Sequence, residues 1–320
     1  MRIRAVLLVS LALLFVASVT LSYVSPSVDD LWVENPFWNG LSDVYTSYKP
    51  IRLDSYLSFS SLVINPVNST ILMLGPSKPY TEYEIATIRD YLEAGGRVVL
   101  TDDFGTGNSL LQGLGLETRF SGELMQDTLF KEKKMMPRIF FIEKTVYTTG
   151  VTELVMNYPT VLNGTGSSQI VAMTSSSSTL GSNTESSGPY PVMTITTFGK
   201  GTIIAISDSS TFINSMIERG NNTRLLRNIV VGTAVIDETH SVTTRLTEVK
   251  AMMAGIYTFL SHPEVKYGLA AVMIVGVFKV RWVGNEEKID EVEEALQRHP
   301  EWDRKELEGL REMRRKARGG

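Results

Sequence analysis

The chain has 320 residues, a formal net charge of −4 at pH 7 and no cysteine. Its length suits one sizeable domain with accessory segments, and its slight acidity argues against a nucleic-acid partner. The lack of cysteine excludes disulfides, thiolate metal sites and cysteine nucleophiles together.

The first predicted element is an apolar helix at the start of the chain. Residues 5–24 contain no charged side chain, and about 20 such residues are enough for an α-helix to cross a bilayer. Arg2 and Arg4 precede this run, so the N-terminus is expected in the cytoplasm. A cleaved signal peptide is the alternative, because small residues such as Ala17 follow a basic start. The length of the run favours a transmembrane anchor over residues 1–24.

Residues 25–240 are predicted to form the main domain, in which strands and helices alternate. A strand at 69–75 is followed by a helix that Thr81 and Glu84 begin as a capping box, and a second strand lies at 97–102. The later elements are a short helix in 105–116, a hairpin over 191–208, a helix around 225–230 and a strand at 232–237. Strands separated by helices indicate a three-layer α/β fold with a mostly parallel sheet.

Two polar segments of this domain are predicted to be exposed loops. Residues 175–189 are rich in serine and of low complexity, so they have little apolar surface to bury. Residues 130–138 carry several lysines and are expected to lie at the surface as well. The first of these loops is also expected to be mobile.

A second apolar helix is predicted at residues 267–283, after a juxtamembrane helical stalk at 241–266. Its uncharged part is short, but Lys279 and Arg281 follow it, and their long side chains can reach lipid headgroups on the cytoplasmic side. The alternative is a buried core helix, because the uncharged run is shorter than the ~17 residues of a membrane span. Residues 284–320 then form a cytoplasmic tail with two short helices.

Nucleotide hydrolysis is the first activity to weigh, because residues 235–240 read VIDETH and match a helicase motif. Such a motif requires a phosphate loop of the form G-x-x-x-x-G-K-[ST], which this chain lacks. The chain also lacks a G-x-S-x-G elbow, and His240 is the sole histidine of the main domain, which is too few for an ordinary zinc site. We therefore expect no catalytic set, no metal and no cofactor.

One set of polar residues remains as a candidate ligand site. Acidic residues follow the predicted strands at their carboxyl ends, where ligands bind in open parallel sheets. The candidate ligand-binding residues are Asp102, Asp208, Asn214, Asp237, Glu238 and His240. They would line one crevice and offer oxygen atoms to a polar ligand or a divalent cation. The alternative is that they cap helices and begin turns, with Glu238 and His240 exposed after the last strand.

Three segments resemble an uncharacterised family of prokaryotic membrane proteins, domain of unknown function 4350. They are residues 81–103 (TEYEIATIRDYLEAGGRVVLTDD), 199–222 (GKGTIIAISDSSTFINSMIERGNN) and 235–240 (VIDETH). The resemblance implies a three-layer domain similar to the class I glutamine amidotransferase-like, or flavodoxin-like, fold. It does not imply that activity, because those enzymes carry a cysteine at a strand–helix elbow.

The sequence as a whole predicts a non-enzymatic, two-pass protein of the cell membrane. Both termini would lie in the cytoplasm, and the main domain would lie outside it and bind a ligand or a partner protein. The alternatives are an extracytoplasmic hydrolase or amidase that uses Asp208, Asp237 and His240, and an accessory subunit of a transporter. Genes of the resembling family commonly neighbour MoxR-type ATPase systems, so a partner of that kind is expected at the tail.

Overall fold

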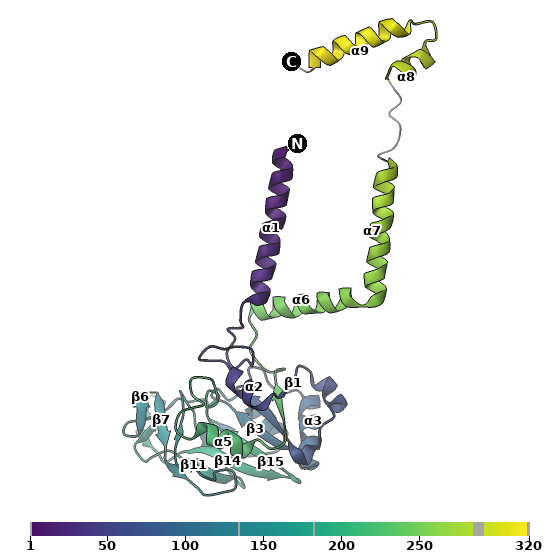
Figure 1. Ribbon diagram of the computed structural model, residues 1–320. Helices are drawn as coiled ribbons and strands as arrows, with labels where there is room; N and C mark the ends of the chain where they lie inside the picture. The colour runs from purple at the N-terminus through teal and green to yellow at the C-terminus, as the bar shows by residue number, and fades with distance from the viewer. Residues whose placement is uncertain (1, 134, 182, 284–290, 319–320) are drawn as a thin grey trace. The chain divides into compact units, whose positions relative to one another are not determined.

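The computed structural model describes residues 2–133, 135–181, 183–283 and 291–318 (Figure 1). The chain divides into two compact units, Met1–Ala251 and Met252–Gly320. The first unit contains the α/β domain. The described residues of the second unit are mostly helical.

An eight-stranded sheet forms the centre of the α/β domain, in the order β1-β16-β2-β3-β15-β14-β11-β8. Its strands are β1 (Ile51–Leu53), β16 (Thr233–Asp237), β2 (Ser69–Leu74), β3 (Arg97–Thr101), β15 (Gly201–Ile206), β14 (Pro191–Phe198), β11 (Gln169–Met173) and β8 (Phe141–Ile142). From β1 to β15 the neighbouring strands are parallel, and from β15 to β8 they are antiparallel. The structure is therefore an α/β fold with a mostly parallel mixed sheet, as the alternation in the sequence predicts.

Helices cover both faces of this sheet. They are α2 (Ser42–Tyr48), α3 (Glu82–Glu93), α4 (Asn108–Gly113) and α5 (Asn222–Ile229), with the short 3-10 helices η1 (Tyr56–Ser61) and η2 (Pro66–Asn68). Ile71 and Met73 of β2 share one core with the apolar residues of α3 and α4, whereas Leu72 and Leu74 share the other core with those of α2 and α5. The side chains of a strand alternate between the two faces, so each face of β2 is buried under helices.

The paths of the chain after β3 and β15 create an opening at the edge of the sheet. These two strands are parallel neighbours, so their carboxyl ends lie together. After β3 the chain continues to α4 on one face, and after β15 it continues to α5 on the other face. Where neighbouring strands send their connections to opposite faces, a crevice forms outside their carboxyl ends.

The predicted capping box at the start of α3 is present. Thr81 Oγ1 accepts a hydrogen bond from the Glu84 backbone N–H (3.4 Å), and the Glu84 carboxylate accepts one from the Thr81 N–H (2.7 Å). Two of the N–H groups that a helix start leaves without partners are thereby satisfied. Gly95, at φ +101°, follows the helix in the left-handed region that glycine tolerates.

The two segments predicted to be loops contain strands, and that part of the prediction is wrong. Residues 130–138 include β6 (Lys131–Lys133) and most of β7 (Met136–Ile139), where Met136 and Ile139 are buried. Residues 175–189 include β12 (Ser178–Leu180) and β13 (Asn183–Ser187). The partner strands and the remaining pair are β5 (Met125–Asp127), β9 (Leu154–Val155), β4 (Arg119–Phe120) and β10 (Leu162–Asn163).

Hydrogen bonds hold the start of the serine-rich segment, where apolar residues are few. Ser175 and Ser177 donate their hydroxyl groups to the carboxylate of Asp127, at 2.6 and 2.8 Å. The hydroxyls of Thr174 and Ser178 lie 2.5 Å apart and are buried. A polar segment can therefore be held in place when a neighbouring strand supplies acceptors for its donors.

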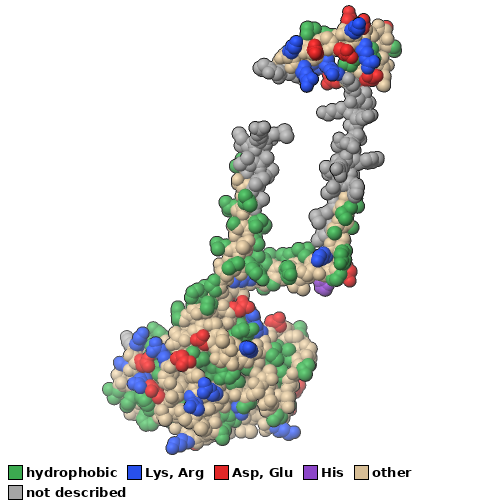
Figure 2. All heavy atoms as spheres, viewed as in Figure 1, with side chains coloured by type: hydrophobic (Ala, Val, Ile, Leu, Met, Phe, Trp, Pro, Cys, Tyr) green, Lys and Arg blue, Asp and Glu red, His purple; other side chains and the backbone are tan. Residues whose placement is uncertain are grey.

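The segments outside the domain are helical, as the sequence predicts. They are α1 (Arg2–Val24), α6 (Arg245–Ser261), α7 (Pro263–Val283), α8 (Glu291–Arg298) and α9 (Arg304–Arg318). Apolar side chains such as Phe15 on α1 and Ile256 on α6 are exposed, and Figure 2 shows apolar surface along both helices.

Membrane crossing was predicted for residues 1–24 and 267–283. Among the residues that the structure describes, no helix combines the length and the apolar character that a membrane span needs. The structure thus confirms helices at both places and gives no support to their role as spans. Residues 284–290 of the predicted tail lie outside the described residues.

Candidate functional site

A cleft of about 850 Å³ lies at the carboxyl edge of the sheet. The loops after β2, β3 and β15 contribute Gly75–Ser77, Asp102–Thr106 and Ser209–Ser210 to its wall. Three segments from elsewhere in the chain, around residues 30–39, 122–124 and 157–160, form most of the remaining wall, together with Ile213 and Val242. We call this opening the edge cleft.

Asp102 lies in the wall of the edge cleft, but both oxygens of its carboxylate are hydrogen-bonded to the backbone. Its two oxygens accept hydrogen bonds from the N–H groups of Phe104 (2.9 Å) and Gly107 (2.6 Å). Burial raises the pKa of this carboxyl, and these backbone donors oppose the rise. Asp102 therefore shapes the loop between β3 and α4, as the capping alternative predicts.

Asp103 also lines the edge cleft and is partly exposed. Its carboxylate accepts hydrogen bonds from both the backbone N–H (2.8 Å) and the hydroxyl group of Ser209. Burial raises the pKa of Asp103 to about 6, and the neighbouring Asp102 charge acts in the same direction. This side chain can thus exchange a proton near neutral pH at the wall of a cleft.

Asp208 does not line the edge cleft. Its side chain is completely buried and accepts hydrogen bonds from the backbone N–H groups of Asn157 (2.7 Å) and Ser210 (2.8 Å). Burial raises its pKa well above the usual value, and the charge of Asp103 adds to the rise. Asp208 therefore ties the segment at 157–160, one wall of the cleft, to the loop after β15.

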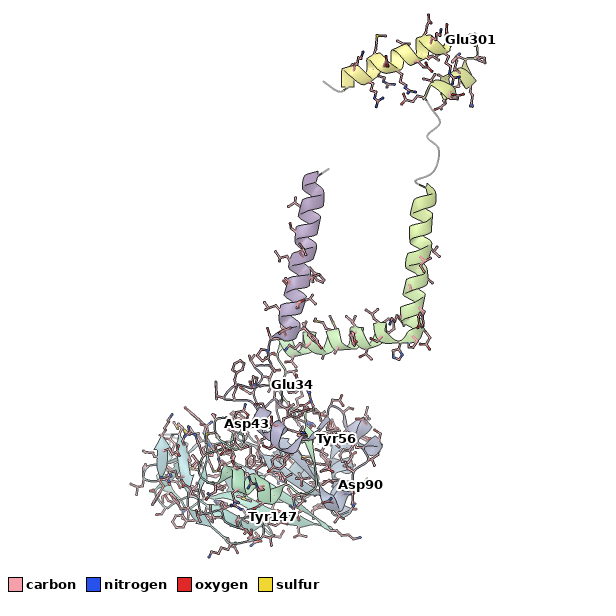
Figure 3. The ribbon with its side chains drawn as sticks, in the orientation of Figure 1. Glu34, Asp43, Tyr56, Asp90, Tyr147 and Glu301 are labelled. Carbon is pink, nitrogen blue, oxygen red and sulfur yellow. The ribbon has the colours of Figure 1, made fainter. Side chains whose placement is uncertain are left out.

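Asp237 and His240 belong to a buried polar cluster that the cleft does not reach. His240 Nδ1 lies 2.8 Å from Asp237 Oδ2, and the same oxygen accepts hydrogen bonds from the hydroxyls of Tyr56 and Tyr80, each at 3.1 Å. The Tyr80 ring stacks on the imidazole at 3.9 Å, and Glu84 lies 3.4 Å from Nε2. We call these five residues the tyrosine–histidine cluster; Figure 3 labels Tyr56.

The tyrosine–histidine cluster is closed to ligands. His240 is 4% exposed and Asp237 is 5% exposed. Burial, and then the Asp237 charge, raise the pKa of both tyrosines well above the usual value. The hydroxyls therefore stay protonated and donate to Asp237. The expectation that His240 is exposed after the last strand is wrong, because the two tyrosines cover it.

Glu238 and Asn214 also have structural partners. Glu238 is 9% exposed, contrary to the expected exposure, and its Oε2 lies 2.7 Å from Arg52 Nε. Asn214 donates to the backbone carbonyls of Asn35 (3.1 Å) and Phe37 (2.7 Å) and accepts from the N–H of Asp43 (3.1 Å). It thereby fixes the start of α2 against the preceding loop.

The structure therefore brings only one of the six candidate residues, Asp102, to the edge cleft. In the described part of the chain, no group of three or more histidine, aspartate and glutamate side chains is arranged to hold a metal ion. The predicted set did not include Asp103, which follows the same strand as Asp102 and lines the cleft. The position of Asp103 directly after Asp102 was the sequence signal that could have indicated it.

No pattern in the sequence indicated that three aromatic side chains would line the edge cleft. Trp38, Phe104 and Tyr158 line the cleft and are 66%, 84% and 56% exposed. They come from three separate loops, so no periodic pattern links them. Asp30 and Glu123 are exposed acidic residues of the same wall. The cleft therefore combines carboxylates with uncovered aromatic rings.

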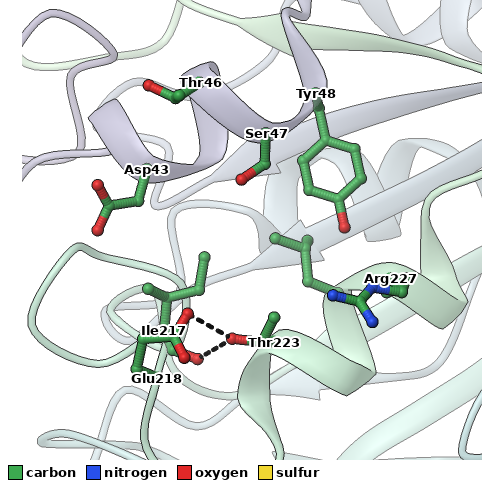
Figure 4. A pocket seen from close by; sticks show the side chains of 9 residues that line it. Asp43, Thr46, Ser47, Tyr48, Ile217, Glu218, Thr223 and Arg227 are labelled. Carbon is green, nitrogen blue, oxygen red and sulfur yellow. Dashed lines mark hydrogen bonds between the residues drawn. The ribbon is translucent and has the colours of Figure 1, made fainter.

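A second cavity of about 420 Å³ lies between α2 and α5 (Figure 4). Its wall contains hydroxyl groups of Thr46, Ser47, Tyr48 and Thr223, and the side chain of Arg227. Thr223 donates its hydroxyl to the Ile217 carbonyl at 2.7 Å, so this group already has a partner within the fold. Burial raises the pKa of Tyr48 and the Arg227 charge lowers it. This cavity is smaller than the edge cleft and lies away from the carboxyl edge of the sheet. It is therefore the weaker candidate for a ligand site.

The fold has distant likeness to solved structures. The "mmIFT52 N-terminal domain" is 13% identical and covers 58% of this chain and 84% of its own, with a TM-score of 0.46. A ThuA-like protein from Bacteroides uniformis is 16% identical and covers 50% and 67%, with a TM-score of 0.32. A β-galactosidase from Bacillus circulans sp. alkalophilus is 12% identical and covers 51% and 23%, with a TM-score of 0.35. Likeness at these TM-scores carries no argument about function.

No curated protein matches the sequence significantly. The family model described as "Domain of unknown function (DUF4350)" matches residues 34–230, which is more than half of the chain. The match contains two of the segments that carry the resemblance, 81–103 and 199–222, and ends before the third. The chain therefore belongs to the DUF4350 family.

Proposed function

We propose that the chain is a non-enzymatic binding protein anchored in the cell membrane, whose α/β domain lies outside the cytoplasm and holds a small ligand in the edge cleft. The edge cleft is the observation that carries this proposal. Its volume of about 850 Å³ falls within the ~300–1,000 Å³ of ordinary ligand sites. It also lies where open α/β sheets bind ligands, outside the carboxyl ends of neighbouring strands.

The partners of the reactive side chains favour binding over catalysis. Asp237 and His240 are occupied by each other and by two tyrosines, and Asp208 is buried under backbone donors. None of these three lines the edge cleft. The residues with which a hydrolase would act are thus held in structural contacts.

A substitution that fills the cleft tests the binding function. Thr106 lines the edge cleft, and Thr106→Trp adds a large side chain there. Ala86→Trp is the matched control, because Ala86 is an exposed residue of α3 outside the cleft. Each purified full-length protein is dialysed against a small-molecule extract of its source cells, and the retained molecules are identified by mass spectrometry. A molecule retained by the wild type and Ala86→Trp but lost with Thr106→Trp supports the proposal, and retention of no molecule by the wild type overturns it.

The proposed placement rests on the apolar sequences of residues 5–24 and 267–283. The absence of cysteine makes it simple to test, because single cysteines can be introduced one at a time. Lys144→Cys marks the α/β domain and Glu312→Cys marks the tail, and both positions are exposed. In intact cells, a membrane-impermeant maleimide is expected to label the first cysteine and not the second. Labelling of the tail alone contradicts the placement.

A carboxylate-based hydrolase is the second candidate, and one observation favours it. Asp103 lies in the cleft wall with a pKa of about 6 and beside the Ser209 hydroxyl, so it could act as a general acid or base. Hydrolysis of chromogenic esters, amides or glycosides that rises with pH through about 6 and is lost in Asp103→Asn would establish this activity in place of simple binding.

The tail is proposed to bind a cytoplasmic partner, for example a MoxR-type ATPase or a transporter. Two ion pairs link α8 and α9, Arg304 to Glu293 (2.8 Å) and Arg314 to Glu291 (3.9 Å), and Val292 is buried between the helices. The two helices thus form a preformed surface. Co-purification of such a partner with the full chain, and its loss when residues 291–320 are removed, is the test.

A further inference from the structure

The charged residues of the edge cleft are all acidic. They are Asp30, Asp102, Asp103 and Glu123, and no lysine or arginine lines the cleft. The carboxylate of Asp102 accepts hydrogen bonds from two backbone N–H groups, that of Asp103 from Ser209, and that of Asp30 from Asn39. All of these donors are neutral, so no cation of the wall balances the negative charge. An unbalanced negative charge in a partly apolar cleft is unfavourable until a positive group enters it.

The same wall carries aromatic faces. The side chains of Trp38, Phe104 and Tyr158 are more than half exposed although each borders the cleft. Aromatic faces attract cations, and indole does so most strongly, with about 0.5–2 kcal/mol for each contact. Carboxylates and open aromatic faces in one wall therefore select for the same kind of ligand.

We propose that the edge cleft binds a small organic cation. Its ammonium or guanidinium group pairs with the carboxylates of Asp30, Asp103 and Glu123, and its carbon skeleton packs against Trp38, Phe104 and Tyr158. This inference rests on the proposed function, because both place the ligand in the same cleft.

The other ligand classes fit this wall less well. An anion would be repelled by every charged residue of the cleft. A bare metal ion lacks its ligands, since no group of three acidic or histidine side chains among the described residues is arranged to hold one. A neutral sugar could stack on the rings, but it would leave the carboxylates without a counter-charge.

Asp103 gives the binding a pH dependence. A bound cation favours its ionised form, so binding is expected to tighten as pH rises through about 6. The other ionisable groups that face Asp103 are Asp102 on the same loop and Asp208 on the loop after β15. The Asp102 charge acts in the opposite sense to the cation, and the Asp103 charge in turn raises the pKa of Asp208. The ligand must therefore outweigh the like charge of Asp102.

Three probes with one skeleton and different charges test the proposal on the full-length protein in detergent. They are phenethylamine, which is a cation at pH 7.5, neutral 2-phenylethanol and anionic phenylacetate. Calorimetric titration is expected to show at least about tenfold tighter binding of the amine than of the alcohol, and no binding of phenylacetate. Equal affinity for the amine and the alcohol overturns the proposal.

Variants locate the binding. Glu123→Gln and Trp38→Ala are each expected to weaken amine binding by about fivefold or more, and Asp103→Asn is expected to remove its dependence on pH. Asp90→Asn, an exposed acidic residue of α3 outside the cleft, is the matched control. Glu123 is exposed, so its variant keeps the test meaningful if Asp103→Asn folds poorly.

The two proposals fail in different ways. If the alcohol or phenylacetate binds as well as the amine and Thr106→Trp blocks it, the cleft is a ligand site and the cation inference is wrong. If no probe binds while the dialysis experiment retains a neutral or anionic molecule, the same conclusion follows. If no probe binds and dialysis retains nothing, both proposals are overturned.

Discussion

At the end of β16, Asp237 accepts hydrogen bonds from two tyrosines and contacts His240, and the whole group is buried. At the end of β3, in the same sheet, Asp103 contacts Ser209 and faces an open cleft. Both aspartates lie at the carboxyl end of a parallel strand: Asp237 is the last residue of β16, and Asp103 lies two residues after β3. The sequence around them gives the same signal, yet one becomes part of the core and the other borders a candidate site.

The difference lies in what the neighbouring loops supply. Tyr56 from η1 and Tyr80 before α3 bring aromatic rings and hydroxyl donors over Asp237, so its charge is compensated inside the protein. Around Asp103, the loops at 30–39 and 157–160 hold their aromatic side chains at the rim and leave space between. An acidic residue at a strand end is therefore structural or available according to whether distant segments cover it.

Replacing Asp237 is expected to have the largest effect on stability. Asp237→Asn places an amide where three donors now converge, and it leaves buried hydroxyl and imidazole groups without a full acceptor. Loss of one partner from a buried charged network costs about 3–5 kcal/mol. Urea unfolding followed by tryptophan fluorescence, to which the buried Trp32 contributes, measures the change, with exposed Asp90→Asn as control. A loss below about 1 kcal/mol would mean that the cluster contributes little to stability.

The second-largest loss of stability is expected for Asn214→Ala. Asn214 was predicted to bind a ligand, but it holds the start of α2 in place. The variant removes hydrogen bonds to two carbonyls and one N–H, and about 2 kcal/mol of unfolding free energy should be lost. Asn228→Ala, which removes a single exposed bond to Thr149, is the control and should cost a few tenths of that. If Asn214→Ala left stability unchanged and weakened ligand binding, Asn214 would be a ligand-binding residue, as the sequence predicted.

Replacing Asp103, which borders the open cleft, is expected to change stability less, by an amount that depends on pH. Burial raises the pKa of Asp103 to about 6 in the folded state, so the folded protein holds this proton at pH values where the unfolded chain has released it. Stability is then lost as pH rises from about 4 to about 6. Between pH 5 and 7.5, Asp103→Asn should gain about 1 kcal/mol relative to the wild type in urea unfolding. A gain that does not change with pH would contradict this.

The smallest effect is expected at Glu238. Its ion pair with Arg52 is half-exposed on the arginine side, and burial of Glu238 raises the pKa of the carboxyl despite that partner. The attraction and the desolvation cost nearly offset each other, so Glu238→Gln should change the unfolding free energy by less than about 0.5 kcal/mol. A loss above about 1.5 kcal/mol would show that this residue matters as much as its neighbour Asp237.

Much of the fold could be predicted because its signals are local. The capping box at Thr81 and Glu84, the glycine after α3 and the apolar strands of the sheet depend on neighbours within a few residues. The loops predicted at 130–138 and 175–189 failed for the opposite reason. Asp127 pairs with Ser178 of β12, and β7 pairs with β9 as well as with its neighbour β6, so composition alone does not reveal these strands.

The sequence by itself determined β2, α3, β3, α4, the β14–β15 hairpin, α5, β16 and the mostly parallel character of the sheet, since these follow from periodicity and from helix and turn chemistry. Only the tertiary structure decided that Tyr56 and Tyr80 close over His240, that Asn214 and Glu238 serve the framework, and that Asp103 faces a cleft with Trp38, Phe104 and Tyr158. Each of those outcomes depends on loops that approach one another from distant parts of the chain, and their packing leaves no periodic trace in the residues themselves.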